Sequence, residues 1–216
     1  MIAVETIGST RYKAEPSPAH SIPKVGVLAL QGDYAAHIAA LREAGAEAFE
    51  IRGASDLGRA DSVVIPGGES TVMSSLLQRF GFLEAFKERI KAGMPVFGTC
   101  AGLILLAKDV EGRSQPGLGS LDITIRRNAY GTQIDSFRAA VATTLPGVGK
   151  IEGVFIRAPK IIRVGPNVEV LATHEGSPVL VREGSILGAA FHPELIPGAL
   201  IHRWFLGMSC EPRKEQ

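Results

Sequence analysis

The feature that most constrains the fold is a regular alternation of short apolar runs with helical patterns in the first half of the chain. Apolar runs such as "KVGVLAL" (24–30) are typical of buried strands, and the segments between them repeat apolar residues at helical spacing. This alternation predicts a parallel sheet with helices on both faces. We expect strands at 24–30, 46–51, 61–66 and 95–98, and helices at 32–45, 70–80, 82–93 and 101–110.

The second half of the chain has a different pattern. From Leu121 to Phe191, strand-like segments separated by turn residues predict antiparallel hairpins, and a last helix follows near 198–207. We expect an α/β fold of flavodoxin-like three-layer type, with a mixed, mostly parallel central sheet that gains antiparallel strands in the C-terminal half. We assign residues 24–208 to this one domain, residues 1–23 to a flexible N-terminal extension and residues 209–216 to a polar C-terminal tail.

The composition excludes several classes of function. Of the 216 residues, 23 are Lys or Arg and 22 are Asp or Glu, so a net charge of +1 favours neither nucleic acid nor a membrane surface as a partner. No window is long and apolar enough for a membrane helix, and the N-terminus lacks the apolar core of a signal peptide. The two cysteines, Cys100 and Cys210, form no disulfide framework, and no Cys/His cluster has zinc spacing. We therefore expect a cytoplasmic protein without a metal site.

One cysteine lies where a predicted strand turns into a predicted helix, in "PVFGTCAGLILLA" (95–107). The arrangement Gly98-x-Cys100-x-Gly102 between strand and helix is that of a nucleophile elbow, in which glycines permit a strained turn and close packing. A helix N-terminus also stabilises the thiolate, which is the attacking form of cysteine. The N–H of Ala101 would then point at the oxyanion of a tetrahedral intermediate. The alternative is a small cysteine that packs in the core.

A cysteine nucleophile needs a base, and the base needs an orienting group. His192 closes an apolar run in "FHPEL", and Pro193 favours an extended backbone there. Residues two apart in an extended segment face the same side, so we expect Glu194 to hydrogen-bond the imidazole that faces Cys100. The alternative is a strand-end histidine beside a solvated glutamate. We interpret the other histidines as surface or turn residues: His20, His37, His174 and His202.

A glycine-rich loop, "PGGES" (66–70), follows the third predicted strand and opens a helix. Paired glycines let backbone N–H groups approach a substrate closely, so Gly68 is our candidate for a second oxyanion donor. In open α/β sheets such a loop shares a crevice with the other loops at the carboxyl ends of the strands. No phosphate-binding or dinucleotide-binding motif competes with this site, so we expect no cofactor.

Together these motifs resemble those of the class I, triad-type glutamine amidotransferases, which hydrolyse glutamine to release ammonia. The order and spacing are similar to those of the glutaminase subunits of pyridoxal 5'-phosphate synthase over about residues 24–207. The strings that carry the resemblance are "GVLALQGDYAAHI", "PGGEST", "FGTCAGLILLAK", "RRNAYGTQIDSF", "GVFIRAP" and "FHPEL". The chain departs from the family in its leading segment and in "RRNAYG", where the family has "ERNSFG".

The resemblance implies a role for each matching residue. Cys100 would attack the side-chain amide of L-glutamine and form a glutamyl thioester, with His192 as base and then acid and Glu194 as orienting group. An arginine pairs well with the α-carboxylate of the substrate, and Glu69 can meet its α-ammonium group. The substrate-binding positions implied are Gly68, Glu69, Ser70, Arg127, Ile156 and Arg157.

The resemblance also implies a partner, a separate (β/α)8 synthase subunit that receives the ammonia and builds pyridoxal 5'-phosphate in a hetero-oligomeric complex. Gln31 and Gly32, after the first strand, would lie near the docking face, and the glutaminase would be nearly idle until the partner docks. Two other hypotheses stay open. One is another class I amidotransferase or a stand-alone cysteine hydrolase. The other is a silent scaffold that binds the synthase, against which the intact Cys100, His192 and Glu194 speak.

Overall fold

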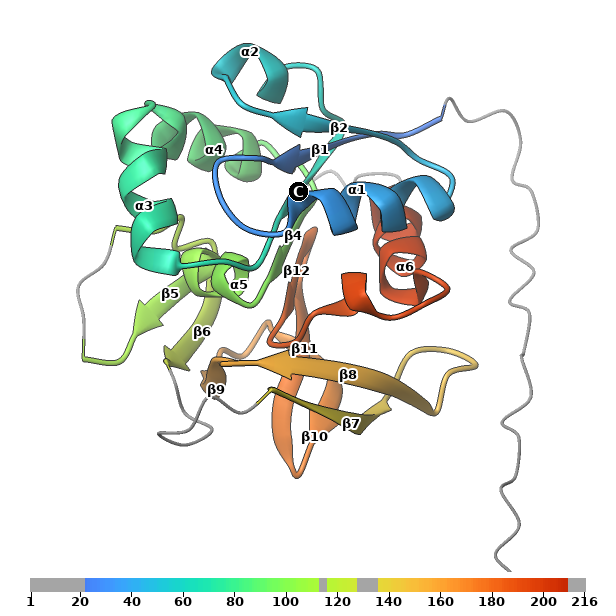
Figure 1. Ribbon diagram of the computed structural model, residues 1–216. Helices are drawn as coiled ribbons and strands as arrows, with labels where there is room; N and C mark the ends of the chain where they lie inside the picture. Colours follow the sequence, from blue (N-terminus) through green and yellow to red (C-terminus); the bar gives the residue numbers. More distant parts are fainter. Residues whose placement is uncertain (1–21, 113–115, 128–135, 210–216) are drawn as a thin grey trace, which may run out of the picture.

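The computed structural model describes residues 22–112, 116–127 and 136–209 (Figure 1). Most of the expected N-terminal extension and of the expected C-terminal tail lies outside these residues, and so do His20 and Cys210. Among the residues described, no helix is long and apolar enough to cross a membrane.

The first half of the chain forms the parallel part of the main sheet. Its strands are β1 (Lys24–Leu28), β2 (Glu47–Ile51), β3 (Ser62–Ile65) and β4 (Val96–Thr99), and β12 (Ile186–Ala189) adds to them beside β4. The order β2-β1-β3-β4-β12 is that of a flavodoxin-like sheet. Because the order reverses between β1 and β3, the loops that follow these two strands adjoin at the carboxyl edge of the sheet.

Helices cover both faces of this sheet (Figure 1). They are α1 (Tyr34–Glu43), α2 (Ala54–Leu57), α3 (Ser70–Arg79), α4 (Phe82–Lys91), α5 (Ala101–Leu106) and α6 (Leu200–Ser209). Helices α1 and α6 contact each other on one face, and α3 contacts α4 and α5 on the other. Helix α1 begins two residues after the start expected from the sequence, and Asp33 caps it, because its carboxylate accepts a hydrogen bond from the Ala36 N–H at 3.3 Å.

The second half of the chain extends the main sheet with antiparallel strands. These are β7 (Ser136–Thr143), β8 (Lys150–Ile156), β10 (Glu169–His174) and β11 (Ser177–Glu183), and the sheet continues in the order β12-β11-β10-β7-β8. A smaller sheet contains β5 (Ala107–Val110), β6 (Leu121–Arg126) and β9 (Lys160–Val164) in the order β5-β6-β9. After β12 the chain makes a short 3-10 turn, η1 (Pro193–Leu195), before α6.

The segment after the cysteine differs from the sequence prediction. The helix expected over 101–110 ends at Leu106, and the chain passes directly into β5. Ala107 has an extended backbone (φ −59°, ψ 141°), and β5 pairs with β6, which is a partner that the local sequence does not reveal. Tertiary pairing therefore overrides a helical pattern here. The short elements α2 and β9 were not predicted either.

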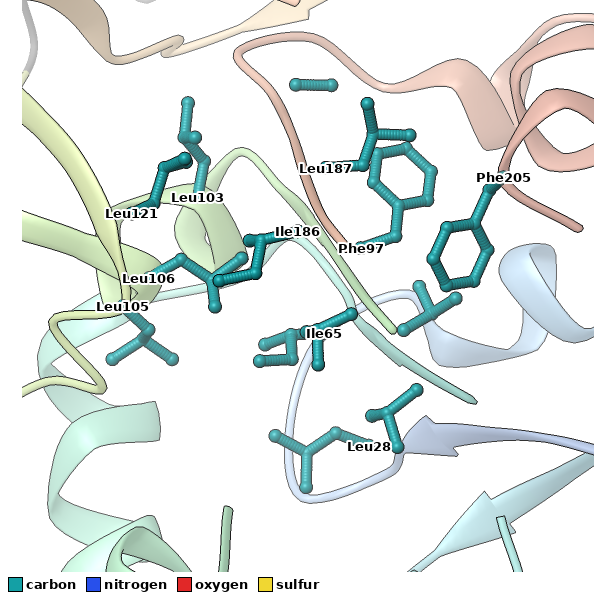
Figure 2. Close-up of a cluster of buried hydrophobic side chains, with 14 of the residues drawn as sticks. Leu28, Ile65, Phe97, Leu103, Leu105, Leu106, Leu121, Ile186, Leu187 and Phe205 are labelled. Atoms are coloured by element: carbon teal, nitrogen blue, oxygen red, sulfur yellow. The ribbon is translucent and has the colours of Figure 1, made fainter. Parts of the chain in front are cut away.

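Apolar side chains hold β4 from both sides. Figure 2 shows Phe97 of β4 close to Leu187 of β12 and Phe205 of α6. Leucines of α5 and β6 form a second group in the same view: Leu103, Leu105, Leu106 and Leu121. All seven side chains are completely buried, and each contributes about 1.5–3 kcal/mol to the free energy of unfolding. The strand that leads into Cys100 is therefore anchored in the core.

Candidate active site

Cys100 lies at the turn between β4 and α5. Its backbone (φ 48°, ψ −100°) is in a region that residues other than glycine rarely adopt. Close packing explains the flanking glycines, because a Cβ on Gly102 would lie 2.1 Å from the Ile65 carbonyl oxygen. A Cβ on Gly98 would lie 2.7 Å from the Gly102 carbonyl carbon. The turn therefore has the strain and the close helix–strand approach of a nucleophile elbow.

His192 and Glu194 are in contact, with His192 Nδ1 2.7 Å from Glu194 Oε1. The extended backbone that we expected between them is wrong, since Pro193 begins the 3-10 turn η1. Proline suits the first position of a helical turn, because its fixed φ is helical and its missing N–H is not needed there. The backbone N–H of His192 donates to the Val154 carbonyl at 2.8 Å, which ties the turn to β8.

The protonation of His192 suits a cysteine nucleophile. Burial opposes a charge on this imidazole, but hydrogen bonds and charge interactions with Cys100 and Glu194 outweigh it and raise the pKa of His192 to about 10. An imidazolium at neutral pH is the neighbour that stabilises a thiolate. The Cys100 thiol also faces the Ile156 carbonyl oxygen at 3.8 Å.

The backbone of Gly67 forms the wall beside these side chains. A Cβ at this position would lie 2.5 Å from His192 Cε1 and 3.4 Å from the Cys100 Cβ. Glycine is therefore needed here for the imidazole to occupy its place beside the thiol. Of the two glycines in "PGGES", only Gly68 is a predicted site residue, but the pair of adjacent glycines is a signal for Gly67 as well.

The loop of residues 66–70 packs on the loop that follows β1. Gln31 Oε1 accepts a hydrogen bond from the Glu69 N–H at 2.8 Å, and a Cβ on Gly68 would lie 2.7 Å from the same oxygen. A Cβ on Gly32 would lie 1.8 Å from the Gly67 carbonyl oxygen. Gln31 and Gly32 thus support the loop that contains the candidate oxyanion donor, and their part in docking a partner stays a prediction.

Arg127 follows β6 and reaches the start of α3. Its Nη2 lies 3.0 Å from Glu69 Oε1, and its Nη1 donates to Thr71 Oγ1 at 3.2 Å. Glu69 Oε2 accepts from the Val72 N–H at 2.8 Å, which makes Glu69 the N-cap of α3. Partial burial acts against ionisation, but hydrogen bonds from Val72 and Thr71 and the charge of Arg127 keep the pKa of Glu69 below its usual value. Two candidate substrate-binding groups are therefore paired with each other.

The remaining candidates lie at strand and helix ends. Ser70 begins α3, and it is buried. Ala101 begins α5, so its N–H has no acceptor within the helix. Ile156 ends β8, and Arg157 after it is exposed with a left-handed backbone (φ 45°). The other residues of "RRNAYG", from 128 on, lie outside the described residues.

Two histidines that we interpreted as surface residues are completely buried. His37 and His202 are both 0% exposed, and His37 Nε2 lies 3.3 Å from Glu194 Oε2. The prediction was wrong because it considered only the position of each residue along its helix. His37 precedes the buried Leu41 by four residues, and His202 precedes the buried Phe205 by three, so each lies on the buried face. This spacing is the signal that could have found them.

Comparison with known proteins places the chain in a family. The model of the "SNO glutamine amidotransferase family" matches residues 27–211. The chain belongs to this family. A "Pyridoxal 5'-phosphate synthase subunit PdxT" of Mycolicibacterium vanbaalenii is 53% identical over 192 residues, which are 86% of this chain and 97% of the relative. The protein of the same name from Thermotoga petrophila is 50% identical over 187 residues, 86% of this chain and 98% of the relative.

Two solved structures share the fold of this chain. One, described as "Crystal structure of glutamine amidotransferase", matches with a TM-score of 0.81 and 44% identity over 86% of this chain and 98% of its own. Another, "Structure of PurLQS from Thermotoga maritima", matches with a TM-score of 0.66 and 15% identity over 87% of this chain and 98% of its own, which shows the fold alone. The α/β fold with a mixed sheet that the sequence predicts is confirmed.

Proposed function

We propose that this chain is the glutaminase subunit of a pyridoxal 5'-phosphate synthase. The family match and relatives about half identical over nearly their whole length support this proposal. The observation that carries it is the contact chain at the elbow, where Cys100 on a strained turn faces an imidazolium, His192, whose other nitrogen is 2.7 Å from Glu194. A nucleophile, a base and an orienting carboxylate are the three groups that acyl transfer from an amide needs.

In the first half-reaction, the Cys100 thiolate attacks the side-chain carbonyl carbon of L-glutamine. The carbonyl oxygen takes the negative charge of the tetrahedral intermediate, with the N–H groups of Gly68 and Ala101 as its donors. The His192 imidazolium gives its proton to the amide nitrogen, and the C–N bond breaks. Ammonia leaves, and a glutamyl thioester remains on the cysteine.

In the second half-reaction, neutral His192 takes a proton from water, and the water oxygen attacks the thioester carbon. The C–S bond breaks, glutamate leaves, and the Cys100 thiolate and the His192 imidazolium are restored. Glu194 holds the Nδ1–H of the ring throughout. This contact leaves Nε2 as the nitrogen that serves the reaction in both halves.

Substrate binding uses the charges beside the elbow. The α-carboxylate of glutamine pairs with Arg127, and its α-ammonium group pairs with Glu69. The side chains of this pair are 22% and 43% exposed, so exchanging their mutual contact for contacts with substrate costs little. Ser70, Ile156 and Arg157 complete the binding positions.

The ammonia acceptor in this proposal is a separate (β/α)8 synthase subunit, with Gln31 and Gly32 near the docking face. The two proteins form a hetero-oligomeric complex, and ammonia passes between them without release to water. A reducing, cytoplasmic location suits this chemistry, because Cys100 must stay a free thiol.

The test is release of glutamate from L-glutamine by the full chain, alone and with the synthase subunit of the same organism. We expect the partner to raise the rate, and we expect Cys100→Ala to abolish glutamate release in the complex. The Cys100→Ala complex should still make pyridoxal 5'-phosphate when ammonium chloride replaces glutamine, because only the glutaminase step is lost.

Three outcomes would contradict the proposal. Glutamate release by Cys100→Ala would exclude this nucleophile. Rapid turnover of glutamine without any partner, with no response to the synthase subunit, would indicate a stand-alone hydrolase. Failure of Cys100 to react with a diazoketone analogue of glutamine, even in the complex, would indicate a silent scaffold.

A further inference from the structure

A cluster of buried polar side chains lies behind Glu194, on the side away from His192. His37 of α1 and His202 of α6 are in contact, with His37 Nδ1 3.0 Å from His202 Nε2. His37 Nε2 lies 3.1 Å from Thr99 Oγ1, on the last residue of β4, and 3.3 Å from Glu194 Oε2. Side chains of three elements remote in sequence therefore meet at His37, which faces the Glu194 carboxylate.

This cluster is enclosed by the core. Thr99 and both histidines are 0% exposed, and the Glu194 side chain is 0% exposed as well. The ring of Phe97 packs against both imidazoles, with centroids 6.4 Å from His37 and 5.8 Å from His202. Figure 2 shows Phe97 and Phe205 facing each other on this side of β4. In the described part of the chain, no group of three or more His, Cys, Asp or Glu is arranged to hold a metal ion.

The contacts fix the direction of the hydrogen bonds. A carboxylate oxygen and a lone pair repel each other, so the nitrogen that faces Glu194 Oε2, His37 Nε2, must carry the proton. His37 Nδ1 is then an acceptor, and His202 Nε2 must donate to it. The opposite direction would leave a buried N–H on His202 Nδ1, an atom without a hydrogen-bond partner among the described residues, and would aim a lone pair at Glu194.

The two oxygens of Glu194 thus face two different imidazoles. Glu194 Oε1 lies 2.7 Å from His192 Nδ1, and Glu194 Oε2 lies 3.3 Å from His37 Nε2. Oε2 is buried and accepts no hydrogen bond of standard geometry within the described residues. With the proton on Nε2, His37 donates to Thr99 Oγ1 at 3.1 Å, and the same nitrogen lies 3.3 Å from Oε2. Rotation of the carboxylate about its terminal bond would break the hydrogen bond at Oε1 and move Oε2 away from the His37 ring.

We propose that His37, oriented by His202, is a positioning residue that fixes the plane of the Glu194 carboxylate and thereby the orientation of His192. The proposal rests on the proposed glutaminase function of the same site. His37 touches neither the thiol nor the substrate in this assignment. It acts through Glu194, as Glu194 acts through His192.

The electrostatics agree with a neutral donor. Burial, then the neighbouring His202 and His192, hold the pKa of His37 well below its ordinary value, and burial lowers the pKa of His202 to about 4. The titratable groups that face His37 are His202 from α6, His192 after β12 and Glu194 from η1. Because both helix histidines stay neutral, the charge of Glu194 remains available to the imidazolium of His192.

The experiment compares three variants of the full chain. His37→Leu removes the N–H donor and introduces an apolar side chain with a high helix propensity. His37→Gln instead places an amide N–H near the position of the ring Nε2. His174→Leu is the matched control, because this histidine ends β10, its ring centroid lies 5.4 Å from that of Phe155, and none of its contacts among the described residues is with the triad. Each variant is assayed for glutaminase kcat and KM with the synthase subunit. Each is also titrated alone by NMR of the labelled imidazoles.

We expect His37→Leu to lower kcat about tenfold to a hundredfold with KM changed less than about twofold, because a misoriented base affects the chemical step. The pKa of His192 should fall by about one unit or more from its value of about 10, since the Glu194 carboxylate can then turn away from the ring. His37→Gln should restore both quantities most of the way. His174→Leu should change neither.

A merely structural role would lower the melting temperature and leave the titration of His192 in place. Wild-type kcat in folded His37→Leu, or an unchanged His192 pKa in that variant, would overturn the proposal. If His37→Leu does not fold, His202→Leu decides by the same two measurements, because it removes only the group that orients His37.

The titration keeps this inference separate from the proposed function. If the wild-type complex releases no glutamate, the glutaminase assignment fails. The titration of His192 in the variants still shows whether His37 fixes Glu194.

Discussion

The two glutamates of the candidate site, Glu194 and Glu69, are held in opposite ways. The side chain of Glu194 is completely buried, and its oxygens face His192 and His37. The side chain of Glu69 is 43% exposed, and it contacts Arg127 and the first turn of α3. A buried charge depends on every partner, since losing one leaves a desolvated group, whereas an exposed ion pair contributes only about 0–1 kcal/mol. The difference teaches which part of the site is fixed before the reaction and which part can exchange its contacts for substrate.

The largest expected effect comes from the buried carboxylate. Glu194→Gln keeps the shape of the side chain and removes the charge that supports the His192 imidazolium. We expect kcat to fall about 10³-fold with a small change in KM. Steady-state glutaminase kinetics of the complex measure it, and a loss of less than tenfold would contradict the fixed role of Glu194.

The next largest effect is expected at Gly67, whose backbone packs against the His192 ring. Gly67→Ala places a methyl group 2.5 Å from His192 Cε1, so the ring must move away from the thiol. We expect a loss of about 10²-fold in kcat and slower alkylation of Cys100 at neutral pH. Gly149→Ala is the control, because a Cβ there meets nothing within 4 Å. Equal kcat values for Gly67→Ala and Gly149→Ala would contradict this prediction, because they would show that the methyl group does not displace the His192 ring.

The exposed side should respond in KM rather than in kcat. Arg127→Gln removes the cation that faces Glu69, and we expect KM for glutamine to rise about tenfold with kcat changed less than about threefold. The free energy of unfolding should change by less than about 1 kcal/mol. Arg126→Gln, which breaks the neighbouring pair with Glu111, is the matched control and should leave KM unchanged. If Arg127→Gln lowered kcat and left KM unchanged, the proposed difference between a fixed Glu194 and an exchangeable Glu69 would be wrong.

The smallest effect appears only in acid. His202 stays neutral when folded because burial lowers its pKa to about 4, whereas the unfolded chain takes up the proton at about 6.5. The unfolded state therefore binds more protons in this window, and each such histidine lowers the free energy of unfolding by up to about 1.4 kcal/mol per pH unit as the pH falls. His202→Leu should show a shallower loss between pH 6.5 and pH 4, measured by urea unfolding at several pH values. An unchanged slope would contradict a buried neutral His202.

The parts of the site that the sequence predicts are those with a local signature. Glycines at both sides of Cys100 predict the elbow because only close backbone approach requires them there. The contact between His192 and Glu194 was also predicted, but through an extended backbone that the 3-10 turn replaces. A spacing of two residues is compatible with both geometries, so the pairing could be found without the conformation.

The parts that escaped prediction depend on contacts between remote segments. His37 and His202 are separated by 165 residues, and their contact exists only because α1 and α6 pack on the same face of the sheet. The helix expected over 101–110 ends at Leu106 for a similar reason, because residues 107–110 pair with β6 as a strand. The local hydrophobic pattern predicts whether most segments form a helix or a strand, and pairing with remote segments determines the remaining ones.

The direct passage from α5 into β5 has a mechanical consequence. No connecting loop separates the helix that begins after Cys100 from the strand beside β6, and β6 ends one residue before Arg127. Cys100 and Arg127 therefore lie at the two ends of one continuous unit, which consists of α5, β5 and the paired strand β6. A displacement of the small sheet would therefore reach both the nucleophile and the arginine, because the same pair of strands is joined to each of them.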